Sequence, residues 1–289
     1  MRLMSLVILS QAKDLLVRAA AIALVAIAPP LVAQKPPDTV LLEELTWDEL
    51  RDLIRAGKTT VIIPTAGTEQ KGPHMVVGAH RVVMEYTAEK IARRLGNAVV
   101  APAIAYVPEG MWGDTVGHMS KPGTITLPDE QFSALLSNAG KSLKASGFTN
   151  ILFLGDHGGT QTAMRNVAAK LNDEWKGTGV RAHFIGDYYA KSRTDAAKFL
   201  SSKLAISDSD AVAHAGVWDT SELLFINPKL IRMDKRAPGG GFPNSGVGGV
   251  KADPSKATAD LGRALVQIKI DNAVAQIKTS IAATTEKNP

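Results

Sequence analysis

Cysteine is absent from the 289 residues of this chain. The absence excludes disulfides, thiolate metal ligands and a cysteine nucleophile. Any bound metal must therefore be held by histidine, aspartate or glutamate, which favours Zn, Mn, Fe, Co or Ni over a cysteine-rich structural zinc. The chain also lacks the G-x-S-x-G pattern, which weighs against a serine hydrolase.

The sequence contains no dense cluster of lysine and arginine, and its formal net charge is only +5. A nucleic-acid partner is therefore not expected. Apolar residues make up 45% of the chain and charged residues 21%, which is typical of a globular protein.

The N-terminal segment resembles a secretory signal peptide. "LLVRAAAIALVAIAPPLVAQ" (15–34) contains an arginine, an apolar stretch and then small residues around Ala33. A membrane anchor is the alternative, but Pro29 and Pro30 interrupt the run and it is short for a span. We therefore expect a signal peptide over 1–33, no stable membrane insertion after cleavage, and a periplasmic or secreted protein. A linker over 34–43 and a single domain over 44–285 follow.

Apolar strands alternate with helices along this domain. Strands are predicted over 59–67, 98–106, 150–155 and 180–189, and helices over 46–58, 81–96, 127–147, 160–175 and 258–283. This alternation favours an α/β fold with a mostly parallel sheet. Ligands bind at the carboxyl ends of such strands. Glu69 and the Asp156–His157 pair follow two of the strands, so we expect them at the same edge of the sheet.

Five of the six histidines lie in or beside glycine-rich turns, an uncommon pattern for a residue that is the most frequent metal ligand. They are His74, His80, His118, His157 and His214. His183 lies inside a predicted strand, so we interpret it as structural. The glycine-rich stretch 237–249 follows no strand and is either an active-site loop or a plain surface loop.

Four ordered motifs resemble the creatininase family. "GTEQKGPHMVVGAH" (67–80) is similar to the family's E-Q-H-G-P-H-L-P-L-G-T-D, and "GHMSKPGTITL" (117–127) to E-H-x-x-F-P-G-T-x-S-L. "LGDHGGTQ" (154–161) is similar to N-G-H-G-G-N, and "HAGVWDTSELLFINPKLI" (214–231) to H-[AG]-G-x-x-E-T-S-L-M-L-x-x-x-P-x-L-V. The resemblance covers about residues 44–280. It implies a three-layer α/β/α sandwich, a two-metal site, hydrolysis of C–N bonds in small or cyclic amides, and a homo-oligomer, often a hexamer.

The family's metal ligands transfer to this chain only in part. Glu69 and His157 match, but Lys71 stands where the family has histidine, and His80 where it has the bridging aspartate. Gly159 occupies the position of a further glutamate ligand of creatininase itself. An imidazole offers a metal one lone pair, and a protonated lysine offers none. We therefore predict one divalent metal, zinc first and manganese or iron next, bound by Glu69, His80 and His157.

The resemblance and the residue types suggest roles for the remaining polar residues. Lys71 would stabilise a developing oxyanion, or act as a base if burial lowers its pKa. His214 or His118 would relay a proton to the leaving nitrogen. We expect five further residues to contact the ligands or to line the pocket, each with a purely structural alternative: His74, Asp156, Trp112, Trp218 and Asp219.

Together these interpretations predict a secreted metal-dependent amidohydrolase that attacks a small amide substrate with one metal-activated water. The alternative is a secreted, non-catalytic binding protein that kept the fold and lost the two-metal site.

Overall fold

The computed structural model describes residues 37–236 and 253–285. The chain divides into two compact units, Met1–Asp38 and Thr39–Pro289, and all described helices and strands belong to the second. The predicted signal peptide and the glycine-rich stretch 237–249 lie outside the described residues. Within the described residues, no helix has both the length and the apolar character needed to cross a membrane. Val40, in the segment assigned to a linker, is buried, and its neighbour Leu41 forms a bridge with Val100.

A four-stranded, wholly parallel sheet forms the centre of the domain, in the order β2-β1-β3-β4. The strands are β1 (Thr60–Thr65), β2 (Ala98–Val100), β3 (Asn150–Gly155) and β4 (Arg181–Phe184). The predicted parallel sheet is thus confirmed. β2 is shorter than the predicted strand 98–106, because Pro102 lacks the N–H that a ladder needs. β4 ends at Phe184 rather than at 189, because the chain turns there into the 3-10 helix η4 (Gly186–Tyr188).

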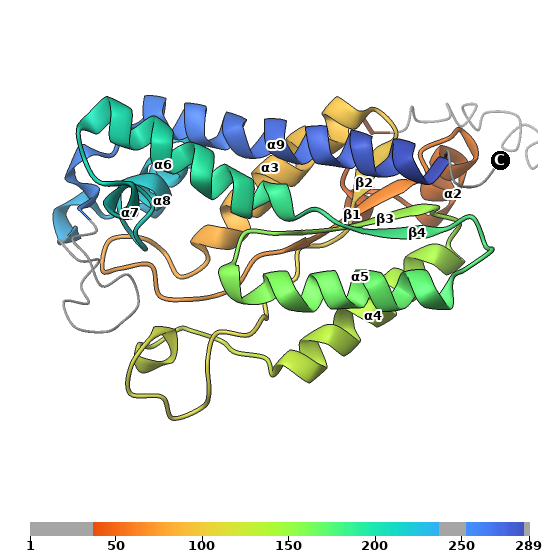
Figure 1. Ribbon diagram of the computed structural model, residues 1–289, viewed down its shortest axis with the longest axis horizontal. Helices are drawn as coiled ribbons and strands as arrows, with labels where there is room; N and C mark the ends of the chain where they lie inside the picture. The colour runs from red at the N-terminus through yellow and green to blue at the C-terminus, as the bar shows by residue number, and fades with distance from the viewer. Residues whose placement is uncertain (1–36, 237–252, 286–289) are drawn as a thin grey trace, which may run out of the picture. The chain divides into compact units, whose positions relative to one another are not determined.

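Helices cover both faces of the sheet, which confirms the three-layer α/β/α arrangement (Figure 1). One face packs against α3 (Ala79–Leu95) and α9 (Ala259–Thr285), and the other against α4 (Asp129–Ala145) and α5 (Gln161–Glu174). Neighbouring residues of a strand point to opposite faces. Accordingly, Ile62 packs with the α3 and α9 side chains, while Val61 and Ile63 pack with those of α4 and α5.

Two helix termini follow directly from the local sequence. Thr46 and Glu49 form a capping box at the start of α2 (Trp47–Arg55), which satisfies backbone N–H groups at the start of the helix. Helix α3 begins at Ala79, two residues before its predicted start, and ends at Gly96 in the left-handed conformation (φ 80°). The early start of α3 places His80 in the first turn of the helix, beside the ends of the strands.

Three helices that the sequence analysis did not predict stand beyond the end of β4. They are α6 (Ala190–Leu204), α7 (Asp208–Ala211) and α8 (Val217–Ile226), and Figure 1 shows them gathered at that end of the sheet. Leu200, Trp218 and Leu265 join α6, α8 and α9 in one apolar cluster. This apolar cluster packs beside the carboxyl edge of the sheet, where the candidate site lies.

Candidate metal centre

The Glu69 carboxylate lies at the carboxyl edge of the sheet, four residues after β1. Its side chain is 1% exposed, and its backbone N–H donates to the carbonyl of Val77 at 3.1 Å. His157 follows β3 at the same edge, and its Nε2 lies 3.2 Å from Glu69 Oε2. The parallel sheet therefore brings these two residues together, as the strand order predicts.

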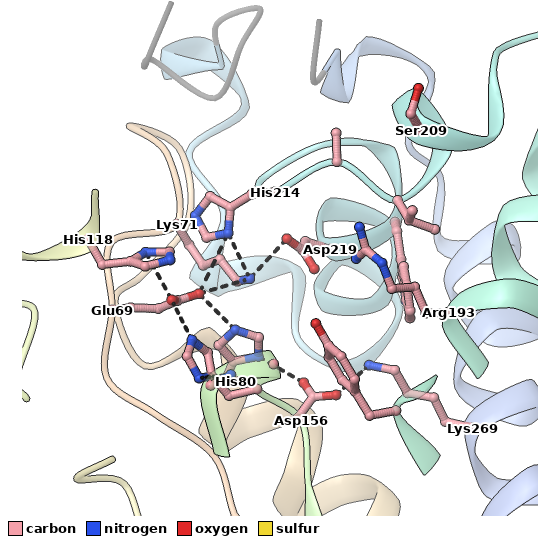
Figure 2. A pocket seen from close by; sticks show the side chains of 17 residues that line it. Glu69, Lys71, His80, His118, Asp156, Arg193, Ser209, His214, Asp219 and Lys269 are labelled. Atoms are coloured by element: carbon pink, nitrogen blue, oxygen red, sulfur yellow. Dashed lines mark hydrogen bonds and ion pairs between the residues drawn. The ribbon is translucent and has the colours of Figure 1, made fainter. Parts of the chain in front are cut away.

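Five nitrogen-bearing side chains surround the Glu69 carboxylate (Figure 2). The nearest nitrogens belong to His80 (2.8 Å), His118 (2.9 Å), Lys71 (3.1 Å), His157 (3.2 Å) and His214 (3.6 Å). Burial by itself raises the pKa of Glu69, but the charges of Lys71 and His80 outweigh burial and hold that pKa well below its usual range. Glu69 is therefore an anion, available to a cation at neutral pH.

Glu109 is a second buried carboxylate at this point, and the sequence analysis missed it. Its side chain is fully buried, and its Oε2 lies 2.9 Å from His157 Nε2. The hydrogen bond of that nitrogen goes to Glu69, however, and within the described residues neither oxygen of Glu109 has a hydrogen-bond partner. Burial raises the pKa of Glu109 and, together with the nearby charge of Glu69, outweighs His157, which lowers it. Two buried carboxylates that share one imidazole nitrogen are costly unless a further cation completes their surroundings.

The space that the Glu109 side chain occupies depends on one glycine. A Cβ atom built on Gly67 would lie 2.6 Å from Glu109 Oε1, closer than atoms can approach. Gly67 also adopts φ 120°, a conformation that side-chain-bearing residues avoid. Glycine at position 67 therefore allows Glu109 to reach the site.

Two carboxylates and two imidazoles meet here as a candidate metal site. Glu69, Glu109, His118 and His157 each offer one ligand atom, and these atoms lie within 4.8 Å of one another. Ligand atoms of a tetrahedral zinc are about 3.4 Å apart, so side-chain shifts of about an ångström would close the site. Mixed oxygen and nitrogen donors suit zinc, manganese or iron. The donor set and the unpartnered Glu109 oxygens both fit a divalent ion.

A series of buried ion pairs connects to the cluster through His80. Asp156 accepts from His80 Nδ1 at 2.9 Å and from Lys269 Nζ at 2.7 Å, and Lys269 also donates to Glu222 at 2.7 Å. Although burial raises the pKa of Asp156, Lys269 and His80 lower it to about 2. For Glu222, burial outweighs Lys269 and raises the pKa to about 7. Asp156 therefore orients His80, and Lys269 is the cation that keeps Asp156 ionised.

Lys269 is expected to contribute strongly to stability. The variant Lys269→Met leaves Asp156 and Glu222 buried without their cation, at a cost of about 3–5 kcal/mol. In a domain of this size that loss lowers the melting temperature by roughly 6–20 °C. Thermal unfolding followed by circular dichroism measures the shift. Lys278→Met, an exposed position on the same helix, is the matched control, and an equal melting temperature for both variants would contradict this role of Lys269.

The cluster opens into a pocket of about 490 Å³. Its walls come from the sheet edge on one side and from α6, α7, α8 and α9 on the other. Trp218 and Asp219 line the pocket, as expected, and so do Tyr189 and Arg193 of the α6 region. Trp112 does not: its side chain is 68% exposed and lies outside this pocket, so the expectation that it forms a pocket wall is not met.

A family model described as creatinine amidohydrolase matches residues 43–277. The chain belongs to the creatininase family. A mycofactocin precursor peptide peptidase of Mycobacterium ulcerans is 26% identical over 234 residues, covering 75% of this chain and 84% of that protein. The creatinine amidohydrolase of Pseudomonas putida is 23% identical over 206 residues, covering 68% and 75%. A solved mutant creatininase of Zn-Zn type has a TM-score of 0.70 at 18% identity, covering 84% of this chain and 99% of that one.

Membership identifies the chain as a hydrolase of the class that acts on amide C–N bonds, in a metal-dependent family. The four-donor cluster is where this creatininase-family chain could hold its metal. The likeness to solved creatininases is a likeness of fold, so the roles of individual residues rest on the contacts of this chain.

The contacts of His80 do not fit its predicted role as a metal ligand. Its Nε2 faces Glu69 at 2.8 Å and its Nδ1 faces Asp156 at 2.9 Å, so both ring nitrogens point at carboxylates. Burial and Lys71 lower the pKa of His80, but the two carboxylates outweigh them and raise it. The pKa of His157 is raised too, to about 9, but only its Nε2 faces the carboxylates, so a metal bound there would displace one proton. A metal on His80 would also break its contact with Asp156 or Glu69. In this geometry His80 holds Glu69 in place, and His118 and Glu109 complete the donor set instead.

Lys71 places a buried ammonium group beside the Glu69 carboxylate. Its Nζ lies 3.1 Å from Glu69 Oε1, 3.0 Å from Asp219 Oδ2 and 3.4 Å from His214 Nδ1. Burial lowers the pKa of Lys71, but Asp219 and Glu69 outweigh burial and raise it well above its usual range. Lys71 is therefore a fixed ammonium group. The alternative interpretation of Lys71 as a base required a lowered pKa, which this geometry does not produce.

His214 is a neutral imidazole next to Lys71. Its Nε2 lies 2.9 Å from the carbonyl oxygen of Gln70 and donates to it, which leaves the Nδ1 lone pair facing Lys71. Burial and the charge of Lys71 lower the pKa of His214 to about 3. Asp219 completes the arrangement, because its Oδ2 also accepts from the backbone N–H of Ala215 at 2.8 Å.

Two histidines lie away from the cluster and pack in the protein interior. His74 is fully buried, its Nε2 lies 2.9 Å from Thr220 Oγ1, and it does not line the pocket. His183 bonds Ser280 and Asn150, and burial lowers its pKa to about 4. The structural interpretation of His183 agrees with these contacts, and the structural alternative fits His74 as well.

Proposed function

We propose that the protein hydrolyses an amide C–N bond of a small substrate by means of one divalent metal ion bound by Glu69, Glu109, His118 and His157. The observation that carries this proposal is the Glu109 carboxylate, which is buried beside His157 without a hydrogen-bond partner among the described residues. Zinc is the first candidate for this donor set, with manganese and iron next.

When bound, such an ion supplies a water of lowered pKa and polarises the substrate carbonyl. The residues of the chain then divide the remaining tasks. Glu69 and Glu109 balance the positive charge of the ion, and His80, fixed by Asp156, keeps the Glu69 carboxylate oriented. Lys71 places an ammonium group next to the cluster, where it stabilises negative charge that develops on the carbonyl oxygen.

His214 is the candidate for the proton relay to the leaving nitrogen. His118, the other histidine assigned to this role, lies within the donor cluster and is better placed as a ligand. His214 lines the same pocket, and its lowered pKa of about 3 leaves it unprotonated at neutral pH. As a relay it would therefore first take up a proton at Nδ1 and then pass it to the leaving amine.

The alternative function, a non-catalytic binding protein, has less support. Without a metal, the two buried carboxylates of Glu69 and Glu109 share the single Nε2 of His157, an arrangement that is costly to bury. A set of four donors, three of which line a pocket that also contains Lys71 and His214, favours the enzyme.

Metal analysis of the purified protein tests the proposal. After dialysis against zinc, we expect about one zinc per chain, and hydrolysis of at least one member of a panel of small amides and short peptides that depends on the zinc. The variant Glu69→Ala is expected to lose both. Protein that holds metal in fewer than about a tenth of its chains after growth with zinc, manganese and iron would contradict the metal-dependent mechanism.

We also propose that the protein is exported after cleavage between Ala33 and Gln34, and that it forms a homo-oligomer. The signal-like sequence of residues 15–34 supports export, and the family resemblance supports the oligomer. Sequencing the N-terminus of the mature protein and measuring its mass by light scattering check the two statements separately.

A further inference from the structure

Two side chains of the α6 region face the pocket from the same side of that helix. Tyr189 immediately precedes α6, and the backbone N–H of Arg193 donates to the Tyr189 carbonyl at 2.8 Å. Residues four apart in a helix lie one above the other on one face. Both residues line the pocket that contains the metal-ligand cluster, and Figure 2 shows the Arg193 side chain directed into that pocket.

The Tyr189 hydroxyl lies close to the metal-ligand cluster. A Cβ atom built on Gly158 would stand 2.9 Å from this hydroxyl oxygen, and Gly158 directly follows His157. Glycine at position 158 thus leaves the space that the phenol fills. Arg193 stands about one helical turn, or roughly 5 Å, further along the pocket wall. The wall therefore presents a hydroxyl near the cluster and a guanidinium beyond it.

Neither side chain has a partner in the part of the chain that the structure describes. Over residues 37–236 and 253–285, the Arg193 guanidinium makes no hydrogen bond or ion pair, and the Tyr189 hydroxyl makes no hydrogen bond. The other two cationic side chains of the pocket differ, because Lys71 and Lys269 are each held by two carboxylates. Arg193 is thus an exposed cation that no carboxylate of the described residues neutralises.

The chemistry of this pair indicates the ligand that it would bind. A guanidinium group offers two parallel N–H donors that match the two oxygens of a carboxylate. Burial raises the pKa of Tyr189, so its phenol stays protonated and can donate. Asp219, one of the carboxylates that line the pocket, is already bonded to Lys71 and to the backbone of Ala215.

We propose that Tyr189 and Arg193 form a carboxylate-binding subsite, so that the substrate of this enzyme is an amide with a free carboxylate a few bonds from the reacting carbonyl. The class includes N-acyl amino acids and peptides with a free C-terminal carboxylate close to the cleaved bond. The inference rests on the proposed amidohydrolase function and specifies its substrate class. The names of the relatives leave that class open, since one refers to a precursor peptide and another to creatinine.

Binding measurements with two matched probes test the subsite. N-benzoylglycine and its C-terminal amide differ only in the charge of the terminal group. Isothermal titration of the zinc-loaded protein is expected to give about tenfold tighter binding of the acid, as one charge-assisted pair provides. Arg193→Ala is expected to abolish this preference, Arg193→Lys to retain part of it, and Tyr189→Phe to reduce it. Lys198→Ala, at an exposed position of α6 outside the pocket, is the control and should bind like the parent protein.

A carboxylate can also bind the metal directly, so the titrations are repeated after zinc is removed with a chelator. A preference for the acid that persists without zinc and disappears in Arg193→Ala supports the subsite. A preference that survives in Arg193→Ala, equal binding of the two probes, or no binding of either in the millimolar range would overturn it. The proposed function is judged separately, by the zinc content and zinc-dependent hydrolysis of the parent protein, so its failure can be told apart from failure of the subsite.

Discussion

The variant Glu109→Gln is expected to bind zinc on the order of a hundredfold more weakly than the parent protein. Glutamine keeps the shape of the side chain next to Gly67 but removes its charge, and an amide oxygen is a weaker ligand than a carboxylate. Competition with a coloured chelator at neutral pH measures the affinity. The visible spectrum of the cobalt-substituted protein reports separately on any change in the ligand set.

The same variant is expected to be at least as stable as the parent when both are metal-free. In the metal-free protein Glu109 and Glu69 share one nitrogen of His157, so removal of the Glu109 charge relieves the repulsion between two buried carboxylates. Weaker metal binding with an unchanged or higher melting temperature is specific to a ligand role. A lower melting temperature with unchanged zinc affinity would show that Glu109 is structural. Glu85→Gln, on the exposed side of α3, is the matched control.

The parts of the site that the sequence could predict depend on strand ends. Glu69 and His157 follow strands of a parallel sheet, and the geometry of such a sheet brings the ends of neighbouring strands together. β1 and β3 pair over their full length, from Thr60 with Asn150 to Thr65 with Gly155, so these two residues had to meet. The three-layer arrangement was predictable for the same reason, since apolar strands in alternation with helices require cover on both faces.

Glu109 and His118 could not be placed in this way. They lie between β2 and α4, in a stretch whose regular structure consists of isolated bridges and one short 3-10 helix. No periodicity connects such a segment to the sheet edge, and the signal that bears on Glu109, the space left by Gly67, becomes visible in three dimensions. The helical pattern weakly indicates Lys269, because this charged residue falls among the buried positions of α9, between Val266 and Ile270.

His80 shows what residue type alone cannot determine. A histidine near other ligands suggests a lone pair for a metal, but its neighbours decide whether that lone pair carries a proton. Here Asp156 stands on one side of the ring and Glu69 on the other, and both favour the charged form. The contact with Asp156 joins residues 76 positions apart in sequence, so the protonation of His80 depends on tertiary structure.

The variant Lys71→Ala is expected to raise the zinc content from about one to about two per chain. The Lys71 ammonium lies within 3.4 Å of three atoms: a Glu69 oxygen, an Asp219 oxygen and the Nδ1 of His214. The Nε2 of His214 donates to the Gln70 carbonyl, so its Nδ1 has a free lone pair. Truncation of Lys71 thus exposes two carboxylates and one imidazole, a common zinc donor set with a position open to water.

The matched variant Lys71→Met separates charge from space in this prediction. Methionine carries no charge but fills much of the volume of lysine. It therefore removes the cation and still leaves no space for a second ion between the three donors. We expect Lys71→Met to stay near one zinc per chain and to lose about 3–5 kcal/mol of stability, because Glu69 and Asp219 lose their shared partner. Elemental analysis with excess zinc, together with urea unfolding, measures both effects. If Lys71→Ala and Lys71→Met both keep a single zinc, then Lys71 does not replace a second metal ion.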